Sequence, residues 1–512
     1  MKNNNLKNIV MNSAYGMFSY VFVMISTMIT RMAFARYLGR ELLGLNTLFT
    51  SILQILQITE LGIGNAIIVF LYEPVKLLDK EKTKALISLY KKVYNGFTIA
   101  LLSIGLIVQM FILPKIVDTS IDIRMVQNYF FLFLFGVVCS YVCAYSKSIF
   151  YAEQKVRIVS VANAVQKTVV SCLQLIVIFV FENYYAFLLL FIAGNLLENI
   201  LCHRIVMKSH PYLKEPVAER LSKEEKTKII NLVKSIFVVR MSDKILGQSD
   251  SIIINRMIDI VTLGMYGNYH TIFNAVLGLF SPIGAALTSS YGNLSVSASA
   301  EEKYDAYKKS YPFMHYVVLL FSCYFLAFIQ DFIYLTYGLS YKLDNSTAFV
   351  LTIYLYVSLV VTIYYSYQNA LGLHKLDQKQ IIAQVPLNII SSVILAKYMG
   401  LNGVIWGTIL SLIVFSFGFK GRYLYQYVFN QKISIYYTKI IKNSLLSILI
   451  FVFIMKLNNV YVIDSFIAFF IKAVVLMAIT TFLATSMMML DVDFRNYIIK
   501  MIKQLKNKKV SG

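Results

Sequence analysis

The stretch EPVKLLDKEKTKALISLYKK, residues 73–92, places six lysines between the second and third long apolar runs of the chain. The next gap between apolar runs holds only Lys115 and Arg124, and the gap ENYY at 182–185 holds no basic residue. Basic residues return in the central gap, where six of them lie between positions 208 and 228. Because Lys and Arg collect in the short cytoplasmic loops of membrane proteins, this alternation predicts a chain that crosses a bilayer many times.

The composition favours a membrane protein over a soluble one. The chain has 512 residues, of which 58% are hydrophobic and 14% are charged, whereas a soluble domain is nearer half apolar and a quarter charged. The net charge of +22 is spread over alternate short loops and a tail, and this distribution argues against a nucleic-acid-binding face. We therefore expect contact with anionic membrane lipids and no nucleic-acid partner.

About fourteen apolar runs are long enough, at about 20 residues, to span a bilayer as helices. They are continuous rather than alternating in polarity, which favours helices over the strands of a transmembrane barrel. Two neighbouring runs cover 381–399 and 402–428. An even number of spans places both termini on one side, and the lysines near each end put that side in the cytoplasm. The sequence predicts an all-α integral membrane protein.

An internal repeat divides these helices into two lobes. Arg36 and Gly44 are separated by seven residues, and Arg256 and Gly264 repeat that spacing 220 positions later. Six spans separate the two copies, so the lobes keep the same orientation, as in a parallel repeat. The expected parts are a six-helix lobe at 1–207, a cytoplasmic linker at 208–230, a second six-helix lobe at 231–428, two extra transmembrane helices at 429–489 and a basic, cytoplasmic, amphipathic tail at 490–512. Within the linker, Ser222 and Glu225 form a capping-box pattern that predicts a helix start near Lys223.

No catalytic signature marks the chain as an enzyme. The sequence has no metalloprotease, P-loop, nucleophile-elbow or dinucleotide-binding motif. The five cysteines lie in apolar segments without a Cys-x-x-Cys pair, a pattern typical of buried thiols rather than of metal ligands. We expect no metal site and no cofactor.

Charged residues inside the apolar spans are the best candidates for function. A charge at the bilayer centre costs about 2.5–3.5 kcal/mol on insertion scales, so such residues face a cavity or a partner. The cations expected to line a cationic substrate cavity are Arg31, Lys147, Lys167, Arg240 and Lys244. The acids expected to couple ions or to pair with these charges are Glu60, Asp243 and Asp250. Glu198 and Lys472 also lie in spans, Glu198 toward the inner end of its own. A cavity of this charge suits a phosphate or pyrophosphate, whose oxygens match the N–H donors of arginine.

Glycine and proline inside spans predict kinks that serve as hinges. The candidates are Gly62, Gly64, Pro282 and Gly284.

Several short motifs resemble one family of membrane proteins. The run ARYLGRELLGL at 35–45, followed by ELGIG at 60–64, is similar to the start of the Wzx-type polysaccharide flippases. The segments DSIII at 250–254 and LGMY at 263–266 resemble the start of their second half. These flippases belong to the multidrug/oligosaccharidyl-lipid/polysaccharide exporter superfamily. The resemblance implies two six-helix lobes around a cavity, two extra carboxyl-terminal spans and transport by alternating access.

The resemblance also implies a substrate and a place in the cell. We expect a flippase that moves an undecaprenyl-pyrophosphate-linked oligosaccharide across the bacterial cytoplasmic membrane, for capsule, O-antigen or exopolysaccharide biosynthesis. Its expected partners are that lipid-linked oligosaccharide and, in the same pathway, a polysaccharide polymerase and glycosyltransferases. Two alternatives stay open on the sequence alone: a multidrug or small-molecule antiporter of the same superfamily, and a membrane polysaccharide polymerase or ligase.

Overall fold

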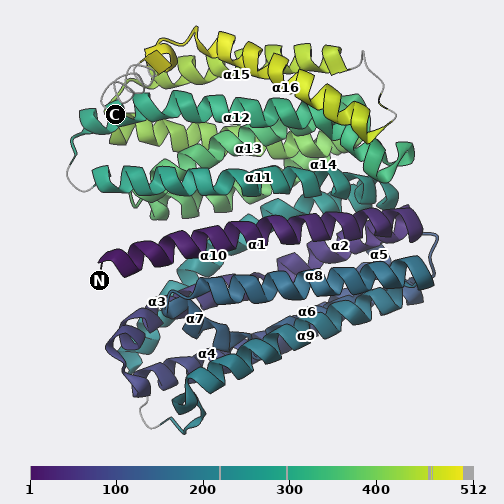
Figure 1. The fold of residues 1–512 in the computed structure, drawn as a ribbon, viewed down its shortest axis with the longest axis vertical. Coiled ribbons are helices and arrows are strands. Elements are labelled where there is room, and N and C mark those ends of the chain that lie inside the picture. Colours follow the sequence, from purple (N-terminus) through teal and green to yellow (C-terminus); the bar gives the residue numbers. More distant parts are fainter. Residues whose placement is uncertain are drawn as a thin grey trace. The chain divides into compact units, whose positions relative to one another are not determined.

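The computed structural model (Figure 1) describes residues 2–217, 221–295, 298–458, 463, 465–496 and 498–499, without the side chains of 2–10, 12–14, 58–63, 65–66, 235, 293–295 and 374–378. Nearly all of these residues are helical and none forms a strand, which confirms the all-α fold class. Eleven described helical segments are long and apolar enough to cross a membrane. The number fourteen stays a prediction, and most of the predicted amphipathic tail lies outside the described residues.

The chain divides into two compact units, residues 1–264 and 265–512. The α-helices of the first unit are α1 (Lys2–Tyr37), α2 (Arg40–Leu56), α3 (Ile58–Leu77), α4 (Lys80–Ile107), α5 (Leu113–Ile116), α6 (Ile123–Tyr141), α7 (Ser148–Ala152), α8 (Val156–Phe181), α9 (Tyr184–Ser209) and α10 (Lys223–Met257). A π-helical turn at Val108–Ile112 and short 3₁₀ turns at Ala144–Lys147 and Pro211–Lys214 join some of them. The predicted domain boundaries stay a prediction.

Long helices of the first unit pack in pairs. α1 lies along α8, and α6 and α8 both lie along α9, as Figure 1 shows. α10 packs on α2 and α3 and so belongs to this unit. It begins at the predicted capping box: the Ser222 hydroxyl accepts the Glu225 N–H at 3.1 Å, and the Glu225 carboxylate accepts the Ser222 N–H at 2.9 Å. The Ser222 N–H, together with the ammonium of Lys82, holds the pKa of the Glu225 carboxyl below its usual value.

The two glycines of the repeat meet inside the first unit. A Cβ on Gly264 would lie 2.9 Å from the backbone nitrogen of Gly44, and a Cβ on Gly44 would collide with the backbone of Ile260. Only glycine permits so close an approach of two backbones. The repeated arginine–glycine spacing therefore marks a tight contact between the beginnings of two helices.

The second unit contains the remaining α-helices, the first of which starts just before the boundary. They are α11 (Ile260–Ser295), α12 (Ala300–Tyr337), α13 (Asn345–Ala370), α14 (His374–Leu412), α15 (Ile433–Asn458) and α16 (Phe466–Met488). Two π-helical stretches, Ile413–Gly421 and Leu424–Val428, extend α14, and a 3₁₀ turn covers Leu339–Tyr341. α12 packs against α13, α15 and α16. α12 also begins with a capping box, Ser299 with Glu302.

α14 is two antiparallel helices joined at Gly400, whose φ of 55° and ψ of −133° are not helical. The two arms bond across the turn: the Asn388 side chain donates to Thr408 at 2.9 Å, and the Ser392 hydroxyl donates to the Val404 carbonyl at 3.1 Å. This hairpin matches the separate runs expected at 381–399 and 402–428.

An ion pair fastens α16 to α12. Lys472 Nζ lies 2.8 Å from the Asp331 carboxylate, and the two side chains are 8% and 15% exposed. Lys472 also donates to the Asn458 carbonyl at 3.3 Å. Lys472, the charged residue of the last apolar span, is thus neutralised by Asp331 inside the second unit. An unpaired charge in a span would be costly.

Candidate functional site

A first polar cavity of the first unit lies among α1, α2, α6, α8 and α9 and has a volume of about 440 Å³. It brings together two cations that the sequence singled out, Arg31 from α1 and Lys167 from α8. We call it the Arg31–Lys167 cavity. Its volume falls within the range of about 300–1,000 Å³ that is usual for small-molecule sites.

The Arg31 guanidinium is oriented by neighbouring helices. One terminal nitrogen donates to the Thr47 hydroxyl at 3.0 Å and to the Gly264 carbonyl at 3.4 Å. Thr47 is itself fixed, because its hydroxyl donates to the Leu43 carbonyl at 2.9 Å. These contacts hold a long, flexible cation in a defined place at the cavity wall.

Lys167 reaches the same cavity from α8. Its ammonium lies 5.7 Å from the centre of the Phe191 ring, a cation–π arrangement that keeps the charge against an aromatic wall. Beside it, both amide atoms of Gln166 are buried and have no hydrogen-bond partner. Gly194 leaves room for that amide, since a Cβ there would lie 2.6 Å from its nitrogen. A buried amide without a partner is costly, so Gln166 is suited to bond a ligand.

The charge balance of this cavity is positive. None of the described residues that line it is Asp or Glu. Its other polar lining residues are amides and hydroxyls: Thr27, Thr30, Asn46, Thr50, Gln54, Gln166, Ser171 and Gln174. Two cations among neutral donors can hold an anion by charge-assisted hydrogen bonds.

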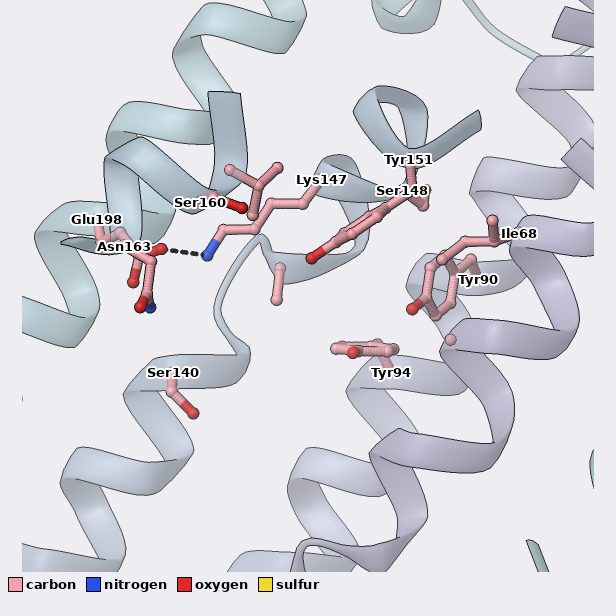
Figure 2. Close-up of a pocket in the computed structure, with 13 residues that line it drawn as sticks. Ile68, Tyr90, Tyr94, Ser140, Lys147, Ser148, Tyr151, Ser160, Asn163 and Glu198 are labelled. Atoms are coloured by element: carbon pink, nitrogen blue, oxygen red, sulfur yellow. Dashed lines mark hydrogen bonds and ion pairs between the residues drawn. The ribbon is translucent and has the colours of Figure 1, made fainter. Parts of the chain in front are cut away.

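The second cavity, of about 510 Å³, lies among α3, α4, α6, α7, α8 and α9. Figure 2 shows its lining residues. Lys147 Nζ lies 2.7 Å from the Glu198 carboxylate, and the two side chains are 16% and 8% exposed. We call it the Lys147–Glu198 cavity. Because its one described cation is paired with its one described carboxylate, the cavity carries no net charge among the described lining residues.

A break in the helices places Lys147 there. α6 ends at Tyr141, Cys143 adopts a left-handed φ of 58°, and a 3₁₀ turn carries Lys147 inward. Carbonyls at a helix end lack intrahelical partners. The Asn199 side chain provides a partner for one such carbonyl at the end of α6, because its amide donates to the Ser140 carbonyl at 2.6 Å. The sequence placed Lys147 in a cationic substrate cavity; Lys147 does line a cavity, and there it is paired with Glu198.

Aromatic residues form the wall opposite this ion pair. The rings of Tyr90 and Tyr94 meet edge to face, with centroids 4.7 Å apart. Figure 2 shows them on one side of the cavity, Lys147 and Glu198 on the other, and the Tyr151 ring between. Gly64 makes space for this wall, because a Cβ there would lie 2.7 Å from the Tyr90 hydroxyl.

The other predicted site residues lie elsewhere. Arg240, Asp243, Lys244 and Asp250 are all on α10; the first two are exposed, Lys244 is half-buried and Asp250 is buried. None of them is among the described lining residues of the two cavities.

The side chain of Glu60 and residue Gly62 lie outside the residues whose side chains are described. Pro282 and Gly284 lie inside α11 in the second unit. A Cβ on Gly284 would lie 2.9 Å from the Ser366 hydroxyl, so this glycine serves close packing of α11 on α13. The hinge role of these glycines and of Pro282 stays a prediction.

Sequence reasoning identified Lys167 but missed the polar stripe along α8 to which it belongs. Its members face the two cavities and recur at intervals of three or four residues: Ser160, Asn163, Lys167, Ser171 and Gln174. This spacing defines one face of a helix, so the stripe was visible as a helical period of polar residues within an apolar span. In the part of the chain that is described, no cluster of three or more His, Cys, Asp or Glu could hold a metal ion.

The family comparison agrees with the resemblance seen in the motifs. The model of the polysaccharide biosynthesis protein family matches residues 9–288, more than half of the chain. The chain belongs to this family, which is the Wzx-like flippase family. It is a multi-pass membrane protein of a flippase and transporter class. None of the curated proteins matches it in sequence.

Solved structures share the fold at low sequence identity. A structure described as lipid II flippase MurJ, in an inward closed conformation, aligns with a TM-score of 0.67 at 16% identity, over 94% of this chain and 99% of that one. An inward-facing multidrug resistance MATE family transporter aligns with a TM-score of 0.58 at 15% identity, over 77% and 92%. The Vibrio cholerae MATE transporter VcmN aligns with a TM-score of 0.55 at 14% identity, over 80% and 94%. These likenesses support the fold of the exporter superfamily.

Proposed function

We propose that this protein translocates a polyprenyl-pyrophosphate-linked oligosaccharide across the bacterial cytoplasmic membrane, for capsule, O-antigen or exopolysaccharide biosynthesis. The observation that carries the proposal is the Arg31–Lys167 cavity. It places two cations and the unpartnered amide of Gln166 among neutral donors, with no carboxylate among its described lining residues. Such a site suits the pyrophosphate group that links the sugar to the lipid.

The same observation disfavours an antiporter of cationic drugs. A cavity that binds cations needs negative charge, and the described residues lining this one supply positive charge instead. Family membership adds a second reason, since the matched family is that of polysaccharide biosynthesis. The expected glycosyltransferase partners would act before the transfer across the membrane, and the expected polymerase after it.

In the proposed mechanism, the protein opens alternately to each side of the membrane. Arg31 and Lys167 replace the water around the pyrophosphate, which lowers the cost of moving its charges through the apolar layer. Arg240 and Lys244, on α10, are proposed as further cations along the substrate path, and Glu60, Asp243 and Asp250 as charges that pair or couple ions. Both termini are proposed to lie in the cytoplasm.

The test is surface polysaccharide export in cells that lack the native gene. The double variant Arg31→Gln with Lys167→Gln should abolish export while the protein remains in the membrane. The loss of two charged hydrogen bonds, each worth about 1.5–3 kcal/mol, amounts to at least a hundredfold in affinity.

A matched control removes two cations from the same helices outside the cavity. Arg36 on α1 is exposed and Arg157 on α8 is half-buried, and neither is among the described lining residues of the cavity. Cells that carry Arg36→Gln with Arg157→Gln should export normally. Normal export by the Arg31 and Lys167 double variant would refute the proposed role of the cavity.

A further inference from the structure

We infer that the Lys147–Glu198 cavity is a binding site for a sugar ring, and that it receives a sugar of the cargo. The second half of this inference rests on the proposed function. The first half rests only on the chemistry of the cavity. In this inference, the cavity binds an uncharged mono- or disaccharide.

The charges of the Lys147–Glu198 cavity argue against the pyrophosphate-binding role that is proposed for the Arg31–Lys167 cavity. Lys147 and Glu198 neutralise each other at 2.7 Å, and no other described lining residue is charged. An anion entering here would have to compete with a buried carboxylate for the single ammonium. Separating such a pair inside a protein is costly, so the cavity favours a neutral ligand.

The polar wall offers both donors and acceptors. It includes the Glu198 oxygens, the Lys147 ammonium, the Asn163 amide and the hydroxyls of Ser140, Ser148 and Ser160. A sugar hydroxyl both donates and accepts, so it bonds best where carboxylate, amide and ammonium groups lie side by side. Asn163 is exposed and Ser160 half-exposed, which leaves these side chains accessible to a ligand.

The aromatic wall supplies the second requirement. Tyr90 and Tyr94 are buried, whereas Tyr151 is only half-buried, and its ring lies between the two walls in Figure 2. A sugar ring has apolar C–H faces that pack on an aromatic ring, while its edge of hydroxyls reaches polar groups. The volume of about 510 Å³ is larger than that of the Arg31–Lys167 cavity and falls in the usual range for small ligands.

The placement along α8 connects this site to the proposed pyrophosphate site. Asn163 lines the sugar cavity and Lys167 lines the cationic one. Four residues of α-helix separate them, an axial rise of about 6 Å. That separation is comparable to the step from a phosphate group to the sugar ring bonded to it, so the inference places the pyrophosphate and the first sugar of one molecule along this stretch of α8.

The test measures binding of two lipids to the full-length protein in lipid nanodiscs, free of sugar-headed detergents. One probe is a polyprenyl pyrophosphate that carries a single hexose or N-acetylhexosamine, and the other is the same lipid without a sugar. We expect the wild type to bind a glycosylated lipid about tenfold more tightly, the equivalent of one or two net hydrogen bonds. The double variant Ser160→Ala with Asn163→Ala should abolish this advantage and leave the affinity for the bare lipid unchanged.

Two further variants test whether the loss of the sugar advantage is specific to this cavity. Tyr151→Leu removes the half-buried ring and should also abolish the sugar advantage. Thr168 is on the same helix and is not among the described lining residues of either cavity, so the Thr168→Ala variant should keep the sugar advantage. The inference is overturned if the folded Ser160 and Asn163 double variant retains the full advantage, or if the wild type shows none with any sugar tested.

Titration with free saccharides tests the sugar site independently of its occupation by the lipid-linked cargo. If neither lipid binds, the proposed function fails, and calorimetric titration with free mono- and disaccharides then decides the sugar site alone. Saccharide binding that Asn163→Ala weakens would support the site without the lipid cargo. No saccharide binding by the wild type would overturn it.

Discussion

The two cavities of the first unit share α6, α8 and α9, yet they differ in charge. The Arg31–Lys167 cavity holds two cations among neutral polar groups, whereas the Lys147–Glu198 cavity holds one ion pair and three tyrosines. The contrast shows that the net charge of +22 says little about ligands. The balance of charge within each cavity decides what it can bind, and that balance depends on which helix brings a carboxylate to which lysine.

The largest effect is expected from breaking the buried ion pair. Lys147→Met leaves Glu198 buried and unpaired, which should lower the free energy of unfolding by about 3–5 kcal/mol. Adding Glu198→Met should restore most of that loss, because an apolar pair needs no desolvated charge. Thermal unfolding of the purified protein measures both.

The pair Lys472–Asp331 in the second unit gives a matched reference. Lys472→Met should destabilise the protein to a similar extent, since this pair has the same chemistry and similar burial. The Lys472→Met, Asp331→Met double variant should keep export, whereas the Lys147→Met, Glu198→Met double variant should impair it. Equal export by both double variants would show that the Lys147–Glu198 pair serves stability alone.

Reversing the charge of the other cavity should give the next largest effect. Lys167→Glu places a carboxylate in the cavity that Arg31 also lines and should weaken binding of polyprenyl pyrophosphate more than a hundredfold, through repulsion of the phosphate groups and the loss of a charged hydrogen bond. Lys167→Gln, which only removes the charge, should cost about tenfold. If the Glu variant binds as well as the Gln variant, the phosphate groups do not approach Lys167.

A smaller effect is expected from the cations on α10. Arg240 and Lys244 are not among the described lining residues of the two cavities, so each is expected to contribute less to a bound anion than Arg31 and Lys167. Arg240→Gln with Lys244→Gln should lower export by about tenfold, the loss of about 1.4 kcal/mol. Export as low as that of the Arg31 and Lys167 double variant would place these α10 residues at the centre of the substrate path.

The smallest effect concerns salt. Raising ionic strength from about 0.05 to about 0.5 M shortens the Debye length severalfold, so affinity for the bare polyprenyl pyrophosphate should fall a few fold. The advantage conferred by a sugar should stay constant, because the Lys147–Glu198 cavity is uncharged overall. A sugar advantage that falls together with the affinity would indicate that both groups bind one charged site.

The helical class and the helix start at Lys223 follow from the sequence, since apolar run length and a capping box are local signals. The sequence named Arg31 and Lys167 among the cavity cations. It could not show which of these cations lie together, because α1 and α8 are far apart along the chain. Lys147 shows why: the sequence placed it among the cavity cations, but its partner Glu198 lies on another helix, and a helix break at Cys143 brings the two together. The polar stripe of α8 was present in the sequence and needed only a helical period to be seen.

The most direct test of the central claim compares two lipids that differ only in charge. The purified wild-type protein should bind polyprenyl pyrophosphate far more tightly than the uncharged polyprenol, and Arg31→Gln with Lys167→Gln should remove that preference. The Arg36→Gln, Arg157→Gln control should keep it. A double variant that folds normally and still prefers the pyrophosphate to the same degree as the wild type would contradict the assignment of the Arg31–Lys167 cavity.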